Sequence, residues 1–493
     1  MSCVAALGIA AALAGCGKTT YFAGRTLPPS GLANRVLIGI QNPTSTTAGQ
    51  LEMVDAFYDI RFHYNSTYTN AQFPIAGYSG KLPTTIQNMP EELLGAVYSF
   101  ADGSLTIISY LKESAQPAVA GVNGLSSSIF VTRNQRFAFA ANQAAHILTV
   151  VNRTTNGSYP LSLPGVYRVS VNPGGSVALA FVQNSNYIYY PRQLSAAQTI
   201  AYSGGPATWP TGAVDCEPQN EPGWCLFQAL DPQTGNPLTF NRPVKAVFSA
   251  DGGTAYIVNC GPECGGSTAP VPGFPATASI SQLPVAPMIF LLGQQSGSLP
   301  TQNTLSTVCA TASSPSGCTL PTPGGASNAL VDGSTLYVVG QEQMPDGYWG
   351  GNLTVATLPA GSATAMTATA TVSISDGAPG AVSRMLLADD NTLWIGMTKC
   401  TNGERANNNQ PYGCLTMVNT TNNAATLLPY SGDATGIAAV TGLHKIYTAE
   451  GGQVYIYSTV DGSSIDNQYV TVTGTAYDVA YMDALTDDNN TVY

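Results

Sequence analysis

The chain has 493 residues, of which 44% are hydrophobic and only 9% are charged, and its net charge is −11. Because globular proteins typically carry about 25% charged residues, Ser, Thr, Asn, Gln and Gly must cover much of this surface. The acidic balance and the lack of a basic run argue against nucleic acid as a partner, whose binding depends on Lys and Arg that neutralise phosphates. They equally argue against electrostatic attachment to anionic lipid.

The N-terminal segment has the pattern of an export signal. A small, apolar run from Val4 to Ala12 is followed by Leu13-Ala14-Gly15-Cys16. A short apolar segment that ends in small residues is typical of a secretory signal rather than of a membrane span. The last four residues resemble the lipobox of bacterial lipoproteins. This resemblance implies cleavage before Cys16, acylation of its thiol and a mature N-terminus held by lipid, with the outer membrane as the expected location.

Residues 1–15 are then the lipoprotein signal peptide, and residues 16–33 are a flexible, lipid-anchored tether rich in Gly, Thr and Pro. Two other readings of the segment remain. It loosely fits a phosphate-binding loop that ends in Gly17-Lys18-Thr19, but such a loop leaves a buried strand and opens a helix. Here a leader-like run precedes it and Pro28-Pro29 soon follow. A buried N-terminal helix is the other alternative.

A repeated hairpin unit dominates the rest of the chain, from residue 34 to residue 493. Short β-rich runs alternate with turns rich in Gly, Asn, Asp and Ser, and helical periodicity is almost absent. The clearest unit, VKAVFSADGGTAYIVN from Val244 to Asn259, reads as a strand, an Asp251-Gly252 turn and a second strand. Related units begin at Ser127, Val166, Ser327, Ser383 and Thr435. The units resemble the YVTN-type β-propeller repeat, which implies a fold but says almost nothing about function.

The second strand of the unit occurs eight times. These strands are Arg35–Gln41, Leu94–Phe100, Arg136–Asn142, Val177–Gln183, Thr254–Asn259, Thr335–Gly340, Thr392–Met397 and Lys445–Glu450. The first of them lacks a preceding strand, whereas the C-terminal strand Ala476–Tyr481 lacks a following one. Joining the two would complete one blade and close the ring without exposed sheet edges.

We therefore predict an all-β fold, namely a β-propeller of eight four-stranded antiparallel blades closed by the N- and C-terminal strands. Seven blades, or a different array such as a pair of β-sandwiches, are the alternatives.

Ten cysteines support an oxidising compartment. Cys3 and Cys16 belong to the leader and the lipobox. Even, close pairing in an exported chain predicts disulfides, and the varied spacings fit zinc clusters poorly. The predicted pairs are Cys216/Cys225, Cys260/Cys264, Cys309/Cys318 and Cys400/Cys414.

The long connections suggest a working surface. If the strands of a blade are named A to D from the axis outward, the B–C and D–A connections share one end of the ring, and the A–B and C–D turns share the other. All four predicted disulfides fall in segments that we assign to B–C or D–A connections. Aromatic side chains in loops held by disulfides offer contact area at low entropic cost, so this end is the expected binding face. In the alternative, the tryptophans of these loops close the end of the propeller channel as a local core. The candidate binding residues are Trp209, Trp224, Phe227, Met344, Tyr348 and Trp349.

Catalytic motifs are lacking in the sequence. The three histidines, His63, His146 and His444, show no metal-ligand spacing, and no G-x-S-x-G nucleophile elbow occurs. The sequence thus predicts no catalytic residue, no metal site and no cofactor.

We expect a lipid-anchored binding or scaffold protein at the bacterial envelope, periplasmic or surface-exposed. Its partner would be an envelope protein or a carbohydrate, and its only membrane contact would be the N-terminal lipid. One alternative is a propeller enzyme, a lactonase-like hydrolase or a quinoprotein-like dehydrogenase, with its site in the central channel. The other is a self-assembling surface-layer component.

Overall fold

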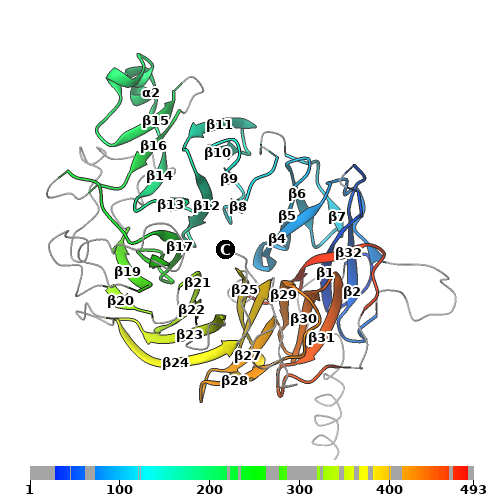
Figure 1. The fold of residues 1–493 in the computed structure, drawn as a ribbon. Helices are drawn as coiled ribbons and strands as arrows, with labels where there is room; N and C mark the ends of the chain where they lie inside the picture. The colour runs from blue at the N-terminus through cyan, green and yellow to red at the C-terminus, as the bar shows by residue number, and fades with distance from the viewer. Residues whose placement is uncertain are drawn as a thin grey trace, which may run out of the picture.

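The structure is a computed structural model. It describes residues 28–44, 46–60, 73–119, 122, 124–218, 223–230, 235–261, 277–285, 319–322, 326–343, 349–359, 366–375, 381–398, 400, 414–465 and 470–486. Within these ranges eight antiparallel sheets surround a common axis (Figure 1). The prediction of an eight-bladed propeller is therefore confirmed. None of the helices in the described ranges is long and apolar enough to cross a membrane.

Blades are numbered from the sheet that holds β1, and their strands are given from the axis outward. Blade 1 consists of β32 (Thr475–Tyr481), β1 (Arg35–Gln41), β2 (Gln50–Asp55) and β3 (Phe73–Pro74). Blade 2 consists of β4 (Pro83–Met89), β5 (Leu94–Ser99), β6 (Ser104–Ser109) and β7 (Ser114–Ala115). Blade 3 consists of β8 (Ser128–Val131), β9 (Phe137–Asn142), β10 (Ile147–Asn152) and β11 (Gly157–Ser162). Blade 4 has five strands, β12 (Val166–Val171), β13 (Ala178–Val182), β14 (Ile188–Gln193), β16 (Trp224–Gln228) and β15 (Ala213–Glu217).

The second half of the ring continues in the same order. Blade 5 consists of β17 (Pro243–Phe248), β18 (Thr254–Asn259), β19 (Ser279–Pro284) and β20 (Thr319–Pro321). Blade 6 consists of β21 (Asn328–Asp332), β22 (Thr335–Gln343), β23 (Trp349–Thr357) and β24 (Thr367–Ser375). Blade 7 consists of β25 (Ala381–Ala388), β26 (Thr392–Thr398), β27 (Leu415–Asn419) and β28 (Ala424–Leu427). Blade 8 consists of β29 (Ala434–Val440), β30 (Lys445–Glu450) and β31 (Gln453–Ser458). The helical segments are α2 (Ala196–Tyr202), η1 (Pro90–Glu92), η2 (Pro206–Thr208) and η6 (Asp389–Asn391).

The C-terminal strand closes the ring as predicted. β32 pairs antiparallel with β1, from Val36 opposite Tyr481 to Gln41 opposite Thr475. A buried ionic cluster reinforces this junction: Arg35 contacts Asp483 at 2.5 Å and Glu113 of blade 2 at 3.0 Å. Residues from both ends of the chain and from the neighbouring blade therefore share one charge network.

Hydrophobic contacts between neighbouring blades make up the core. The strands are buried on both faces, so β1 reads as the nearly continuous apolar run RVLIGIQ rather than as an alternating pattern. Side chains also bond to the next blade. The Gln87 Oε1 atom on β4 accepts from the Val131 amide on β8 at 2.7 Å, and the Ser170 Oγ atom on β12 accepts from the Ala246 amide on β17 at 3.1 Å.

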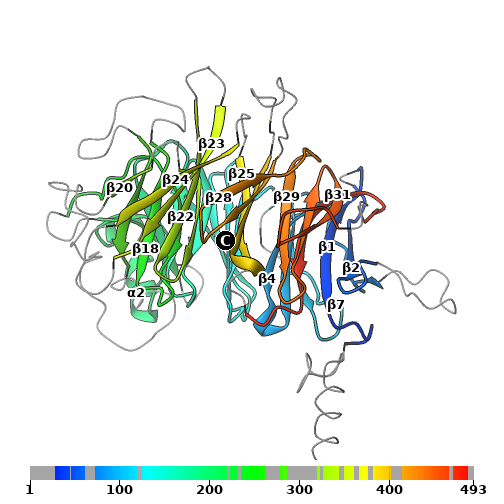
Figure 2. The same cartoon turned by 90° about the horizontal axis from the view of Figure 1, so that it is seen from below.

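The propeller has two distinct ends. We call the end with the A–B and C–D turns the A–B end, and the end with the B–C and D–A connections the B–C end. Residues 194–223 form an insertion between β14 and β16, which is a C–D connection at the A–B end. Figure 2 shows its helix α2 on the opposite side of the ring from the tip of β23. The sequence-based assignment of this segment to a D–A connection is wrong, because the buried run Trp224–Gln228 pairs with β14 and takes the fourth-strand position.

Two of the predicted disulfides are confirmed, but they do not share an end. Cys216–Cys225 joins β15, within the C–D insertion, to β16, the strand that follows it in blade 4. Cys400–Cys414 closes the B–C loop of blade 7, between β26 and β27. The expected gathering of all bridges at one end is therefore wrong. Cys260 is also disulfide-bonded; its predicted partner Cys264, like Cys309, Cys318, Cys3 and Cys16, lies outside the described residues.

Candidate functional site

The candidate aromatic binding residues do not form a common surface. Trp224 is fully buried against blade 3, where its ring meets the edge of Phe137 with centroids 5.3 Å apart. Phe227, 1% exposed, stacks on Tyr190. Both belong to the core, so the structure corrects the expectation that they meet a partner.

The other candidates add little to a binding face. Trp209 is half-buried against the core cluster between blades 4 and 5. The backbone of Trp349 begins β23 opposite Gln343, but its side chain lies outside the described residues. Met344 and Tyr348 lie outside them altogether.

A different set of residues converges on the axis. In six blades the innermost strand carries a β-bulge, a one-residue irregularity that re-aims the side chains beside it. The bulged strands are β4, β12, β17, β25, β29 and β32. The residues that directly follow the bulge are Thr85, Arg168, Lys245, Arg384, Gly436 and Asp478.

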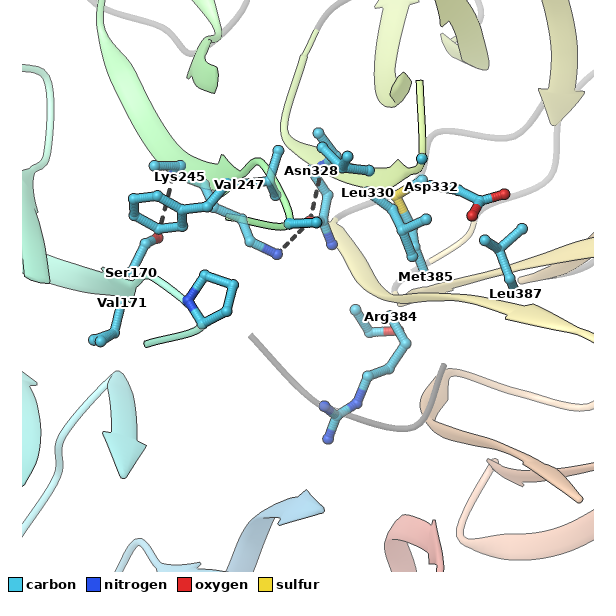
Figure 3. A pocket seen from close by; sticks show the side chains of 18 of the residues that line it. Ser170, Val171, Lys245, Val247, Asn328, Leu330, Asp332, Arg384, Met385 and Leu387 are labelled. Atoms are coloured by element: carbon cyan, nitrogen blue, oxygen red, sulfur yellow. Dashed lines mark hydrogen bonds between the residues drawn. The ribbon is translucent and has the colours of Figure 1, made fainter. Parts of the chain in front are cut away.

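A cavity of about 370 Å³ lies at this level and is lined by blades 4 to 7 together with Arg133 of blade 3. Figure 3 shows Lys245 of β17 reaching toward Asn328 of β21, while Arg384 of β25 extends into the open middle of the ring. Toward the A–B turns the cavity wall becomes apolar. The apolar wall is formed by Val171, Val247, Phe248, Leu330, Met385 and Leu387.

Lys245 is the most perturbed cation of this cavity. Its side chain is buried, and its Nζ atom donates to the Asn328 Oδ1 atom at 2.6 Å. Burial, and secondarily the charges of Arg168 and Arg384, lower the pKa of Lys245 from 10.5 to about 7. An amine with this pKa is charged in only part of the molecules near neutral pH, and it becomes fully charged when a counter-ion arrives.

Arg384 pairs with Asp478, the carboxylate among the residues that follow the bulges. Its Nη2 atom forms an ion pair with Asp478 of β32, which also accepts from the Ile86 amide at 2.7 Å. Burial raises the pKa of Asp478 to about 6, although Arg384 opposes the shift. The pair crosses blade 8, where Gly436 leaves the necessary room: a Cβ atom there would lie 2.6 Å from the Asp478 Oδ1 atom.

The positions that follow the bulges therefore carry an excess of positive charge. They include three basic side chains, Arg168, Lys245 and Arg384, and one carboxylate, Asp478. Nearer the A–B turns, Arg133 and Asp332 line the cavity and add one charge of each sign. In a chain with a net charge of −11, such a concentration of cations creates a local potential suited to an anion.

The repeat contains a signal that sequence reasoning missed. Lys245 is the second residue of VKAV, and Arg168 and Arg384 hold the same place in YRVS and SRML, directly after the bulged residue of each strand. A basic residue at one position of three repeats indicates convergence on the axis once the units are known to form a ring. Strand assignment alone does not reveal it, because the bulge shifts the alternation of side chains by one residue.

Within the described part of the chain, no group of three or more His, Cys, Asp or Glu side chains could hold a metal ion. His444 is exposed at the A–B end, with its Nδ1 atom 2.8 Å from Asp390.

Comparison with known proteins assigns neither a family nor an activity to this chain. No protein family matches the sequence, and no curated protein matches it. Among solved structures, the Swd1 β-propeller domain of Myceliophteria thermophila is 10% identical, with 77% of this chain and 98% of that chain covered and a TM-score of 0.45. Apo AztD from Citrobacter koseri is 9% identical, with 90% and 96% covered and a TM-score of 0.43. The dihydro-heme d1 dehydrogenase NirN is 11% identical, with 92% and 79% covered and a TM-score of 0.46. At these identities nothing follows about ligand or activity.

Proposed function

We propose that this chain is an exported, lipid-anchored binding protein of the bacterial envelope. The cavity lined by Lys245, Asn328 and Arg384, which we call the axial pocket, would take a small organic anion. The observation that carries the proposal is the buried Lys245, which donates to the amide oxygen of Asn328 and whose pKa is lowered by burial and by the charges of Arg168 and Arg384. The ligand class is a carboxylate or similar anionic group attached to an apolar body.

The electrostatic argument is direct. A cation in a buried site is costly unless a counter-charge and hydrogen bonds compensate it. Asp478 already pairs with Arg384, and the nearest polar partner of Lys245 is a neutral amide. An anion in the cavity would supply the missing counter-charge and draw a proton onto Lys245, while Val247 and Leu330 would contact its apolar part.

The proposed location rests on the N-terminal segment and on the cysteines. The resemblance of Leu13–Cys16 to a lipobox implies acylation of Cys16. The disulfides Cys216–Cys225 and Cys400–Cys414 support an oxidising compartment, because such bonds persist outside the cytosol.

An enzyme with its site in the same channel is the second candidate. A lysine with a pKa of about 7 suits general-base or nucleophilic chemistry at neutral pH. In that case Lys245 would act on the anion that Arg384 helps to hold. Product formation from a bound ligand distinguishes the enzyme from the binding protein.

The test compares anions with a neutral analogue. Thermal unfolding of the full chain at pH 6 is followed with benzoate, inorganic phosphate and benzyl alcohol, for the wild type, for Lys245→Met and for Lys112→Met, which removes an exposed lysine. Benzoate should raise the melting temperature of the wild type and of Lys112→Met but not of Lys245→Met. Equal stabilisation by benzyl alcohol, or an undiminished response of Lys245→Met, would contradict the proposal.

A further inference from the structure

Five exposed apolar side chains lie in turns or connecting segments of the A–B end on three adjoining blades. The turn after β2 carries Phe57 and Tyr58, each 54% exposed, and their rings contact each other edge to face. The turn after β6 adds Leu111, the turn after β31 adds Val460, and the segment after β32 adds Leu485. These five residues, on the adjoining blades 8, 1 and 2, are called the A–B patch.

The N-terminal segment of the described chain passes through this patch. β1 is the second strand of blade 1, so it begins at the A–B end. Before it, the Ser30 amide donates to Glu113 at 2.8 Å, two residues beyond Leu111. The Asn34 carbonyl accepts from the Ala56 amide at 2.9 Å, next to Phe57. The segment 30–35 therefore lies between two of the turns that form the patch.

We propose that the A–B patch rests on the lipid surface in which Cys16 is anchored, so that the propeller has a fixed orientation on the membrane. The inference depends on the lipid anchor of the proposed function and goes beyond it. Pro28 follows Cys16 by 12 residues, which span about 40 Å at most. This tether ends inside the patch, so the anchor holds the apolar side chains at a high local concentration near the bilayer.

Charge selects the kind of lipid. Lys112 is the exposed cation beside Leu111, whereas the turns at and beside the patch carry the acids Asp461, next to Val460, and Asp389, which accepts from the Gly442 amide of blade 8. Anionic lipid would repel these acids over a Debye length of about 8 Å. The contact is therefore with zwitterionic lipid, through shallow insertion of apolar side chains.

The orientation has a consequence for the axial pocket. Its lining reaches the A–B turns of blades 4 to 6 through Pro173, Ala250 and Asp332. The patch lies on blades 8, 1 and 2, which occupy the other side of the ring in Figure 1. Docking through the patch would leave the pocket mouth beside the membrane but not covered by the patch.

The test places a fluorescent reporter at each end of the propeller. In the full-length, lipidated chain, Val460→Trp puts a tryptophan in the patch, and Tyr430→Trp puts one on the exposed segment before β29, at the B–C end. Both proteins are reconstituted into phosphatidylethanolamine–phosphatidylcholine vesicles with brominated acyl chains. We expect blue-shifted emission and several-fold stronger quenching for Val460→Trp, with Tyr430→Trp at the wild-type background. Equal quenching of both variants would overturn the inference.

A second comparison separates the patch from the tether. Adding Phe57→Ser, Tyr58→Ser and Leu485→Ser to Val460→Trp should reduce the quenching several-fold. The matched changes Leu125→Ser and Tyr187→Ser, at exposed apolar residues of the B–C end, should not. Unchanged quenching after the patch substitutions would overturn the role of the patch.

Intact mass, measured on the same preparation, distinguishes the two proposals. An acylated Cys16 with an unquenched Val460→Trp would refute the orientation and leave the anchor standing. An unmodified Cys16 would refute the anchor and, with it, the orientation that depends on it.

Discussion

Arg384 of blade 7 and Asp478 of blade 1 form an ion pair, although blade 8 lies between these blades in the ring. Arg384 lies on the innermost strand of blade 7 and Asp478 on that of blade 1, while the innermost strand of blade 8 passes between them. The pair thus connects the axial pocket with the strand that closes the ring. A charged residue that lines the pocket, Arg384, is therefore bound to the strand that closes the ring.

Gly436→Ala tests this arrangement. A Cβ atom at this position would lie 2.6 Å from Asp478 Oδ1 and 2.7 Å from Asp478 Cα, so the closing strand must shift. Overpacking of this kind costs about 1–3 kcal/mol, and we expect that loss in urea unfolding. Gly174→Ala is the control, because the nearest atom to its added Cβ would be 3.9 Å away. Equal stabilities of the two variants would show that Gly436 is not needed for the contact.

The buried cluster at the chain junction makes a second prediction. Asp483→Asn leaves the Arg35 guanidinium, which is 3% exposed, with Glu113 as its remaining carboxylate. Breaking a buried pair from one side costs about 3–5 kcal/mol. Glu91→Gln breaks the exposed pair with Arg133 at 3.9 Å and should cost at most about 1 kcal/mol. A loss for Asp483→Asn as small as that for Glu91→Gln would argue against a role in closure.

Much of the ring could be predicted from local sequence. The expected second strands Arg35–Gln41, Thr254–Asn259 and Lys445–Glu450 agree with β1, β18 and β30 residue for residue. Asp251-Gly252 marks its turn because Gly252 adopts a φ of +69°, which glycine accepts at little cost. The unpaired strands at both chain ends indicated closure, because an open ring would expose two sheet edges.

The site could not be predicted in the same way. Trp224 and Phe227 lie in a segment that also contains Pro and Gly, so it reads as a loop, although tertiary pairing with β14 makes it a strand. The axial cations are far apart in sequence, and only the ring brings Lys245 near Arg384. Strand patterns record burial along each segment but not which blades face each other across a channel.

Burial of Trp224 predicts a structural rather than a binding effect. Its side chain is fully buried among Phe137, Phe139 and Tyr159 of blade 3. Trp224→Ala should lower the free energy of unfolding by about 3–5 kcal/mol. Removing the exposed Ile200 side chain by Ile200→Ala should change it by less than about 0.5 kcal/mol. A stability of Trp224→Ala near that of the wild type would restore the binding-face interpretation.

Glu450 makes the stability of blade 8 depend on pH. Burial raises the pKa of this carboxyl from 4.5 to about 7, and its Oε1 atom accepts from Thr448 at 2.5 Å. Between pH 4.5 and 7 the folded form holds the proton more tightly than the unfolded form, so this group's contribution to stability falls as the pH rises through that window. Glu450→Gln should therefore gain stability over the wild type at pH 8, on the order of 2 kcal/mol, and lose that advantage at pH 4.5. A difference between the two proteins that does not change with pH would contradict the assignment.

The most direct test of the axial anion site is calorimetric titration of benzoate into the full-length protein at pH 6 and at pH 9. The ligand is ionised at both values, whereas Lys245, with a pKa of about 7, is charged at the lower pH and neutral at the higher. We predict affinity at least about tenfold higher at pH 6, and no such pH dependence in Lys245→Met. Equal affinity at the two pH values, or tighter binding at pH 9, would contradict the account.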